Sequence, residues 1–246
     1  MKKRTYIVFL IASLATVILV SQSTQLTVRG FSEGYYKPST GKMKAVIDSV
    51  NYPLICDSGI IGLIDTITNQ TMLCLNSLIN TDGYGTVTVP SSMNGQYYFV
   101  SVKFRNTFHL LSADPILING QPLAVDLTVP QNACCNFDTS YGIAKVYSGD
   151  VNFDGGVDAT DLTIWESDYF NHNTGYLIAD LNGDWLVDTL DLVIMENNAN
   201  WGRTDDYMSN CTPTLTGISE IENQFLNVYP NPATTEINFI CNDCSG

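Results

Sequence analysis

Two acidic segments of twelve residues constrain this sequence more than any other feature. The first runs from Asp150 to Asp161 and the second from Asp180 to Asp191, so they begin 30 residues apart. In both segments, acidic or amide side chains recur at positions 1, 3, 5, 9 and 12. Calcium takes about six to eight oxygen ligands, and a twelve-residue loop supplies them from positions 1, 3, 5, 7, 9 and 12. The spacing therefore predicts a pair of calcium loops, named here the first loop and the second loop.

The expected ligands are five side chains and one backbone carbonyl in each loop. Those of the first loop are Asp150, Asn152, Asp154, Asp158, Asp161 and the carbonyl of Gly156. Those of the second loop are Asp180, Asn182, Asp184, Asp188, Asp191 and the carbonyl of Leu186. Position 6 needs a positive φ, and it is Gly155 in the first loop but Trp185 in the second. Because a bulky residue is strained at positive φ, we expect two calcium sites, of which the second binds more weakly.

An amphipathic stretch follows each loop, and the spacing predicts short helices at Leu162–Phe170 and Leu192–Asn200. Two loops and two short helices would form a small α-helical module over residues 148–202. A core of that size is limited, so bound calcium should supply much of its folding free energy.

Each loop closes with an aspartate, is followed directly by leucine and has no helix predicted directly before it. This pattern over residues 148–202 resembles the dockerin type I repeat. The resemblance implies that the residues above bind calcium. It also implies that positions 10 and 11 of the loops contact a cohesin-type partner; these are Ala159, Thr160, Thr189 and Leu190. The two pairs differ from each other, which argues against a symmetric, dual-mode contact.

Residues 24–130 have short β-rich runs separated by turn dipeptides such as Asp82-Gly83 and Asn94-Gly95. We expect a mainly β fold with an immunoglobulin-like or transthyretin-like sandwich at its N-terminal end. The expected strands are Leu26–Phe31, Lys44–Asp48, Ile60–Asp65, Met72–Leu78, Gly85–Val89, Tyr97–Phe104, Pro115–Ile118 and Leu123–Val129. Exposed tyrosines on such a sheet either lie at the edge of the core or form a platform for a surface glycan; the candidates are Tyr35, Tyr36, Tyr84, Tyr97 and Tyr98.

The N-terminal segment predicts export. A basic start at Lys2, Lys3 and Arg4 precedes an apolar run from Tyr6 to Val20, which is typical of a secretory signal peptide over residues 1–23. The run is shorter than the roughly 20 residues of a membrane span, so we expect no membrane span after cleavage. The net charge of −14 argues against nucleic acid and anionic membranes as partners. The expected location is secreted or cell-surface.

The C-terminal segment contains Tyr229-Pro230-Asn231-Pro232 within an apolar run, after a polar linker over residues 203–224. Residues 225–246 resemble the opening of the C-terminal sorting domain of cargo of the type IX secretion system in Bacteroidota. The resemblance implies the type IX secretion machinery as a partner and this motif as the sorting signal. We expect the chain to hold only the start of that β domain, in truncated form.

Seven cysteines fit an oxidising compartment. Cys134 and Cys135 are adjacent in the expected connector over residues 131–147, and we expect each to pair with a distant cysteine. The connectivity stays open at this stage.

Catalysis has little support in the sequence. The two histidines, His109 and His172, have no flanking nucleophile signature, and the conspicuous acids are already used by the loops. We therefore expect a non-catalytic binding or structural protein. The alternative is an accessory component of a polysaccharide-degrading system that docks to a cohesin-type partner.

Overall fold

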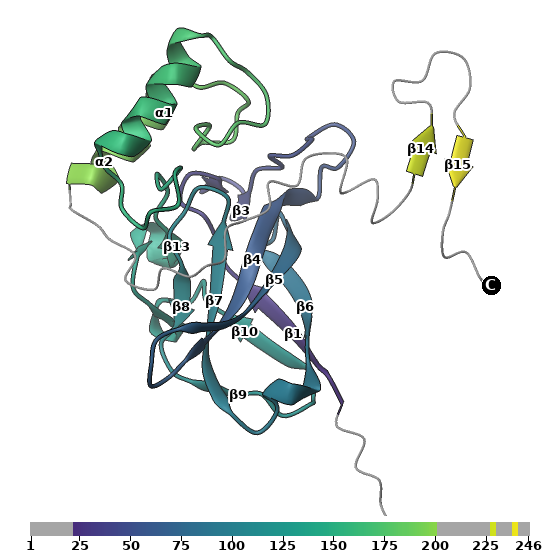
Figure 1. The fold of residues 1–246 in the computed structure, drawn as a ribbon. Helices are drawn as coiled ribbons and strands as arrows, with labels where there is room; N and C mark the ends of the chain where they lie inside the picture. Colours follow the sequence, from purple (N-terminus) through teal and green to yellow (C-terminus); the bar gives the residue numbers. More distant parts are fainter. Residues whose placement is uncertain (1–21, 201–226, 230–237, 241–246) are drawn as a thin grey trace, which may run out of the picture.

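The computed structural model describes residues 22–200, 227–229 and 238–240 of the 246-residue chain. Within them the protein is mainly β, with several sheets and two α-helices (Figure 1). Residues 1–21 of the expected leader, the expected linker, and Pro230, Asn231 and Pro232 of the expected sorting signal lie outside the described residues. No helix in the described part is long and apolar enough to span a bilayer.

The strands between residues 24 and 146 are short except for two. In chain order they are β1 (Thr24–Arg29), β2 (Tyr36–Lys37), β3 (Lys42–Met43), β4 (Ile55–Asp65), β5 (Thr71–Asn80), β6 (Tyr84–Val89), β7 (Tyr97–Phe104), β8 (Leu110–Ser112), β9 (Ile116–Leu117), β10 (Leu123–Asp126), β11 (Ala133–Cys134), β12 (Phe137–Asp138) and β13 (Lys145–Val146). The remaining elements are the 3-10 helices η1 (Ser91–Met93), η2 (Pro130–Asn132) and η3 (Ser140–Gly142), the helices α1 (Ala159–Phe170) and α2 (Thr189–Asn200), and the antiparallel pair β14 (Asn227–Tyr229) and β15 (Asn238–Ile240).

Two sheets form the sandwich. One has the order β10-β1-β6, in which β1 pairs in parallel with β10 and antiparallel with β6. The other has the order β11-β8-β7-β4-β5, with β9 also paired to β7. In the β10-β1-β6 sheet, buried and exposed residues alternate along β6. This alternation is expected of a strand that has one face on the core and the other in solvent. The central strand β4 is buried along nearly its whole length.

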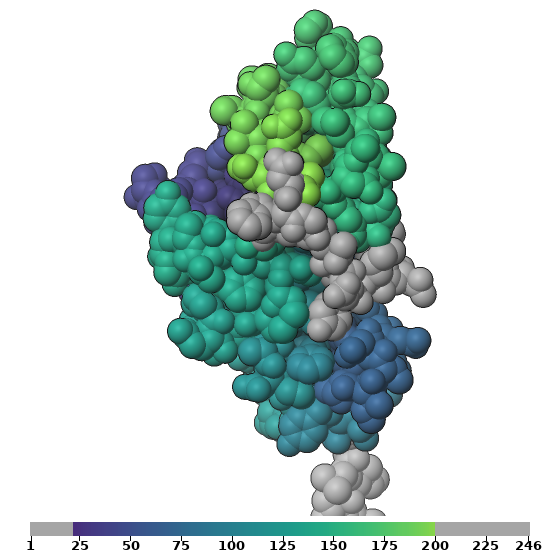
Figure 2. Space-filling view, turned by 90° about the vertical axis from the view of Figure 1, so that its left-hand side faces the viewer, coloured from purple at the N-terminus to yellow at the C-terminus, as the bar shows by residue number. Residues whose placement is uncertain are grey.

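The hydrophobic core extends from the sandwich into the helical part without a break. Leu26 of β1 and Val102 of β7 belong to the same buried cluster as Trp165 of α1 and Met195 of α2. Figure 2 shows the green helical part lying directly on the purple and teal parts of the sandwich. The stability of the loops and helices therefore comes partly from the core that they share with the sandwich.

Most of the expected strands form, but Lys44–Asp48 does not. In that segment the backbone N–H groups of Val46 and Ile47 both donate to the carbonyl of Cys56, at 2.8 and 3.3 Å, so the chain turns onto the end of β4 instead of pairing along it. Residues 131–147 contain three short strands, β11 to β13, and Val146 is completely buried.

The cysteines also differ from expectation. Cys134 and Cys135 are bonded to each other, and Cys56 is free and buried. The expectation of distant partners for Cys134 and Cys135 was wrong, because β11 and the positive φ of Cys135 bring the two side chains together. Cys74 is disulfide-bonded.

Candidate calcium loops and the cations that face them

The carboxylate at position 12 closes both loops in the same way. Asp161 Oδ1 accepts hydrogen bonds from the backbone N–H groups of Val151 and Asn152, at 2.9 and 3.2 Å, and its Oδ2 accepts one from Asp158 at 2.9 Å. In the second loop Asp191 accepts from the three equivalent N–H groups at 2.8, 2.9 and 2.9 Å. The two segments therefore adopt one and the same loop closure, although half of their residues differ.

The carboxylates at positions 5 and 9 bond to the backbone two residues ahead. Position 5 accepts from the N–H of position 7, at 2.9 Å in the first loop and 3.1 Å in the second, and position 9 accepts from position 11 at 2.7 Å in both. Asp158 is also the N-cap of α1 and forms a capping box with Asp161. The helices consequently begin at position 10 of each loop, three residues earlier than expected from the sequence.

The first acid of each loop is completely buried and faces a cation from the end of β7. Asp150 Oδ2 lies 3.0 Å from Lys103 Nζ, and both side chains are at most 5% exposed. Asp180 Oδ2 lies 3.9 Å from Nη2 of Arg105, and both side chains are completely buried. Lys103 is one of the last two residues of β7, and Arg105 is the first residue of the turn that follows it. The end of β7 therefore supplies one positive charge to each loop.

Arg105 links the second loop to the sandwich through several further contacts. Its Nε lies 3.1 Å from Asp57 Oδ2 and donates to the Tyr35 hydroxyl at 2.9 Å. Its Nη1 donates to the carbonyl of Leu177, just before the second loop. Tyr176 donates to Asp57 Oδ1 from the same segment. A buried charge needs such paired and hydrogen-bonded surroundings, so this network fixes the second loop on the sandwich.

Two glycines allow the second loop and the sandwich to pack closely. A Cβ on Gly34 would lie 2.0 Å from the carbonyl oxygen of Leu181, and a Cβ on Gly183 would lie 2.7 Å from Cγ2 of Val46. The second loop thus rests on the residues between β1 and β4, and only glycine fits at these two positions.

Calcium requires several oxygen ligands that converge on one point. Within the part of the chain that the structure describes, no three His, Cys, Asp or Glu side chains converge closely enough to hold a metal ion. The position-12 acids are instead turned to the loop backbone, as described above. Asp150 Oδ1, however, is buried without a hydrogen-bond partner among the described residues. An all-oxygen donor set with one orphaned carboxylate oxygen fits a hard cation, and the calcium assignment stays a prediction.

Burial perturbs the acids at positions 1 and 12. It raises the pKa of Asp150, Asp161 and Asp180, although Lys103 and Arg105 partly offset the effect on the two position-1 acids. It raises the pKa of Asp191 to about 6. Both loops therefore concentrate carboxylates in surroundings that favour neutralisation by a proton or a cation.

Both loops need two residues with positive φ, and each has one glycine and one aromatic residue there. Trp185 at position 6 has φ +73°, as expected from the sequence, where Gly155 has φ +83°. At position 4 the order is reversed, with Phe153 at φ +64° and Gly183 at φ +70°. Each loop therefore holds one strained aromatic residue, and this strain alone does not distinguish the two loops.

The two loops do differ in the basic side chains that lie next to their expected calcium ligands. Lys44 Nζ donates to the side-chain oxygen of Asn182, an expected ligand, at 3.0 Å and to its backbone carbonyl at 2.6 Å. The second loop thus faces Lys44 and Arg105, whereas the first faces Lys103 and retains the free oxygen of Asp150. A neighbouring positive side chain repels a bound calcium ion. We therefore still expect the second site to bind calcium more weakly, because two basic side chains face it and only one faces the first site.

The four expected docking residues are all exposed on the first turns of the helices: Ala159, Thr160, Thr189 and Leu190. The surface around the second pair is more apolar, because Leu186, Leu190 and Val193 are 48, 60 and 54% exposed. The equivalent residues around the first loop are Gly156, Thr160 and Thr163.

The tyrosines do not gather on one surface. Tyr35 and Tyr98 are buried, Tyr36 packs beside Phe31, and Tyr84 and Tyr97 are exposed on different strands. Of the two alternatives for these residues, the structure therefore does not support a single aromatic platform. The cations Lys103, Arg105 and Lys44 were not identified from the sequence, although two charged residues alternating with Phe104 on an otherwise apolar strand were a usable signal.

Comparisons with known proteins give limited similarity. No family model matches the chain, and no curated protein matches it significantly. A chain from the crystal structure of a type II cohesin–X–dockerin complex of Acetivibrio cellulolyticus, an N-terminal interface mutant, is 12% identical, with a TM-score of 0.44. The match covers 74% of this chain and 97% of that chain. Similarity at this level assigns neither a family nor a function.

Proposed function

We propose that this chain is an exported, non-catalytic binding protein of the cell surface, in which two calcium loops are fixed on a β-sandwich. The observation that carries the proposal is the repeated loop closure, in which three equivalent N–H groups bond to Asp161 and to Asp191. In this proposal the sandwich is immunoglobulin-like or transthyretin-like and the loops with α1 and α2 are a dockerin-like module. The leader and the Tyr229-Pro230-Asn231-Pro232 motif support export by the type IX secretion machinery.

Calcium is expected to stabilise the protein. A ligand at a hundred times its dissociation constant adds about 2.7 kcal/mol to the unfolding free energy, which corresponds to a rise in Tm of roughly 5–10 °C for a chain of this size. Thermal melts with calcium and with a chelator measure this shift, and calorimetry gives the stoichiometry. Asp150→Ala should remove the stronger binding event and Asp180→Ala the weaker one.

Asp114→Ala is the matched control, because Asp114 is an exposed acid outside both loops. Its calcium response should equal that of the natural protein. An unchanged calcium response in both loop variants would disprove the assignment of the loops.

A second candidate function is docking to a cohesin-type partner, as an accessory component of a polysaccharide-degrading system. The exposed apolar residues of the second loop and α2 favour it, since such patches mark interaction sites. Binding to a panel of purified cohesin domains should be lost, by more than about tenfold, on replacing Leu190 and Val193 by glutamate. Thr160→Glu, at the position equivalent to Leu190, should have little effect. Equal effects of both changes, or no binding to any cohesin, would exclude this one-sided contact.

A further inference from the structure

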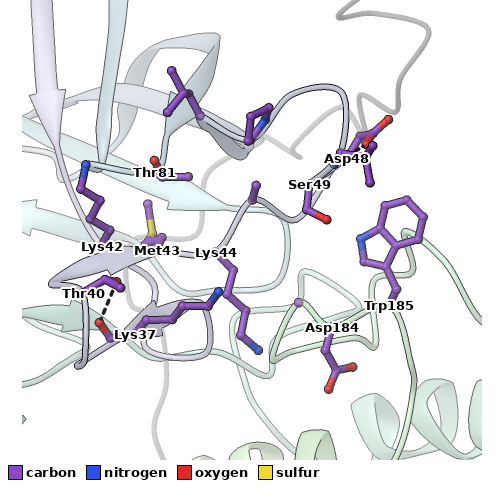
Figure 3. Close-up of a pocket in the computed structure, with 15 residues that line it drawn as sticks. Lys37, Thr40, Lys42, Met43, Lys44, Asp48, Ser49, Thr81, Asp184 and Trp185 are labelled. Carbon is purple, nitrogen blue, oxygen red and sulfur yellow. Dashed lines mark hydrogen bonds between the residues drawn. The ribbon is translucent and has the colours of Figure 1, made fainter.

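A pocket of about 710 Å³ lies between the sandwich and the second loop. Residues between β2 and β4 line one side, and Gly183, Asp184 and Trp185 line the other. Figure 3 shows the Trp185 ring at one end of the pocket and Lys42 at the other, with the amino groups of Lys37 and Lys44 between them. None of these residues is part of the expected calcium ligand set except Asp184.

The pocket gathers basic side chains on an acidic protein. The chain has 11 lysines and arginines against 25 acids, yet three lysines line this pocket: Lys37, Lys42 and Lys44. Elsewhere in the described part, Lys103, Arg105 and Lys145 are buried against carboxylates. Within the pocket, Lys42 pairs with Asp82 at 2.9 Å and Lys44 donates to two oxygens of Asn182. The exposed Lys37, with Lys44 beside it, is therefore the ammonium group most open to an anion.

The two acids of the pocket keep their negative charge, but each is held by hydrogen bonds of its own turn. Asp48 Oδ1 accepts hydrogen bonds from the backbone N–H groups of Val50 and Asn51, both at 2.9 Å, and its Oδ2 accepts from the Asn51 side chain. These bonds hold the carboxylate within its own turn. Asp184 accepts from the Leu186 N–H at 3.1 Å within the second loop. Both acids are thus hydrogen-bonded within their own turns, whereas Lys37 and Lys44 reach the pocket from β2 and from the residue after β3.

Trp185 supplies a fixed flat surface. Its Nε1 donates to the carbonyl of Val46 at 2.7 Å, which holds the ring on the sandwich, while the residue stays 37% exposed. Its backbone is at φ +73°, a strained conformation for a bulky residue, in a loop whose counterpart has Gly155 at that position. Strain that persists in a structure is often found at functional sites. A rigid indole beside ammonium groups matches a ligand with an apolar ring face and a negative substituent.

We propose that this pocket binds an acidic oligosaccharide, with a sugar ring stacked on Trp185 and its carboxylate or sulfate group against Lys37 and Lys44. Hydroxyl groups of Thr40, Ser49 and Thr81 line the same pocket and match the hydroxyls of a sugar. The proposal deepens the binding role proposed above and rests on it, but it does not require calcium in either loop.

The test is calorimetric titration of the full chain with an oligogalacturonate, a sulfated galacto-oligosaccharide and the neutral galacto-oligosaccharide of equal length. We expect the acidic sugars to bind at least about tenfold more tightly than the neutral one, with an affinity that falls as salt rises. The better of the two acidic sugars identifies the anionic group. Equal affinity for the neutral sugar, or no binding of either acidic sugar, would overturn the proposal. Binding of sodium sulfate as tightly as the sulfated sugar would overturn the role of the ring.

Two variants separate the parts of the site. Lys37→Gln changes an exposed side chain and should weaken binding of the acidic sugars about tenfold, and Trp185→Gly should weaken it at least as much. Tyr97→Ala removes an exposed aromatic residue outside the pocket and should bind as the natural protein does. Retained affinity in both pocket variants would refute the site. Calcium titration of the same samples keeps the two proposals apart, because calcium binding without sugar binding refutes the pocket alone, and sugar binding without a calcium response refutes the loops alone.

Discussion

An Arg105→Met variant is expected to lose about 3–5 kcal/mol of unfolding free energy, because removing one partner of a buried ion pair leaves the other charge buried and unpaired. Arg105 is completely buried and lies against both Asp57 and Asp180, so its loss would leave two carboxylates without a cation. Chemical denaturation in the presence of a chelator measures the loss. Adding Asp57→Asn to the variant should restore part of the stability, since it removes one of the two orphaned charges.

Arg29→Met is the matched control for this change. Arg29 pairs with Asp126 at 3.2 Å, but its side chain is 27% exposed and that of Asp126 is 37% exposed. Pairs of this kind contribute about 0–1 kcal/mol. A loss for Arg105→Met no larger than that for Arg29→Met would show that the Arg105 network does not hold the second loop on the sandwich.

A Lys103→Met variant is expected to change stability and calcium affinity in opposite directions. Without calcium it should lose about 3–5 kcal/mol, because Asp150 is completely buried and would lose its cation. With calcium we expect the first loop to bind at least about tenfold more tightly, which is about 1.4 kcal/mol. The reason is that the ammonium group at 3.0 Å from Asp150 Oδ2 no longer opposes a second cation. Calorimetry and denaturation, each with and without calcium, give both quantities.

Lys145→Met separates the two effects. Its side chain is 3% exposed and lies 2.7 Å from Asp138, away from both loops. This control should lose stability without a change in calcium affinity. An unchanged or lower affinity in Lys103→Met would mean that Asp150 is not a ligand, and the calcium assignment of the first loop would then fail.

The sequence predicted the features that depend on residues close together in the chain. The repeated spacing of Asp150–Asp161 and Asp180–Asp191 predicted two equivalent loops, and the hydrogen bonds of Asp161 and Asp191 repeat between them. The run Gly85–Val89 was predicted to be a strand, and β6 spans it with the alternating burial of a half-buried strand. Local patterns succeed here because loop closure and strand alternation are settled within about a dozen residues.

The difference between the two loops is not contained in position 6 alone. Position 6 alone suggested that Trp185 makes the second loop the strained one, but Phe153 has the corresponding positive φ at position 4 of the first loop. The turn glycines of the two loops are exchanged between positions, and a pattern that requires glycine only at position 6 does not detect this. We expect the order of calcium affinities to be set instead by charges from outside the loops.

What the sequence by itself determined is the pair of loops, the helix that follows each and the β character of the region before them. What only the tertiary structure decided is their surroundings. Lys103 is 47 residues from Asp150 and Arg105 is 75 residues from Asp180, and both ion pairs form because β7 ends beneath the loops. Likewise, Lys37, Lys44 and Trp185 line one pocket only because the second loop packs on the segment between β1 and β4. Contacts between distant segments depend on how whole elements pack, and no local pattern in the chain records that packing.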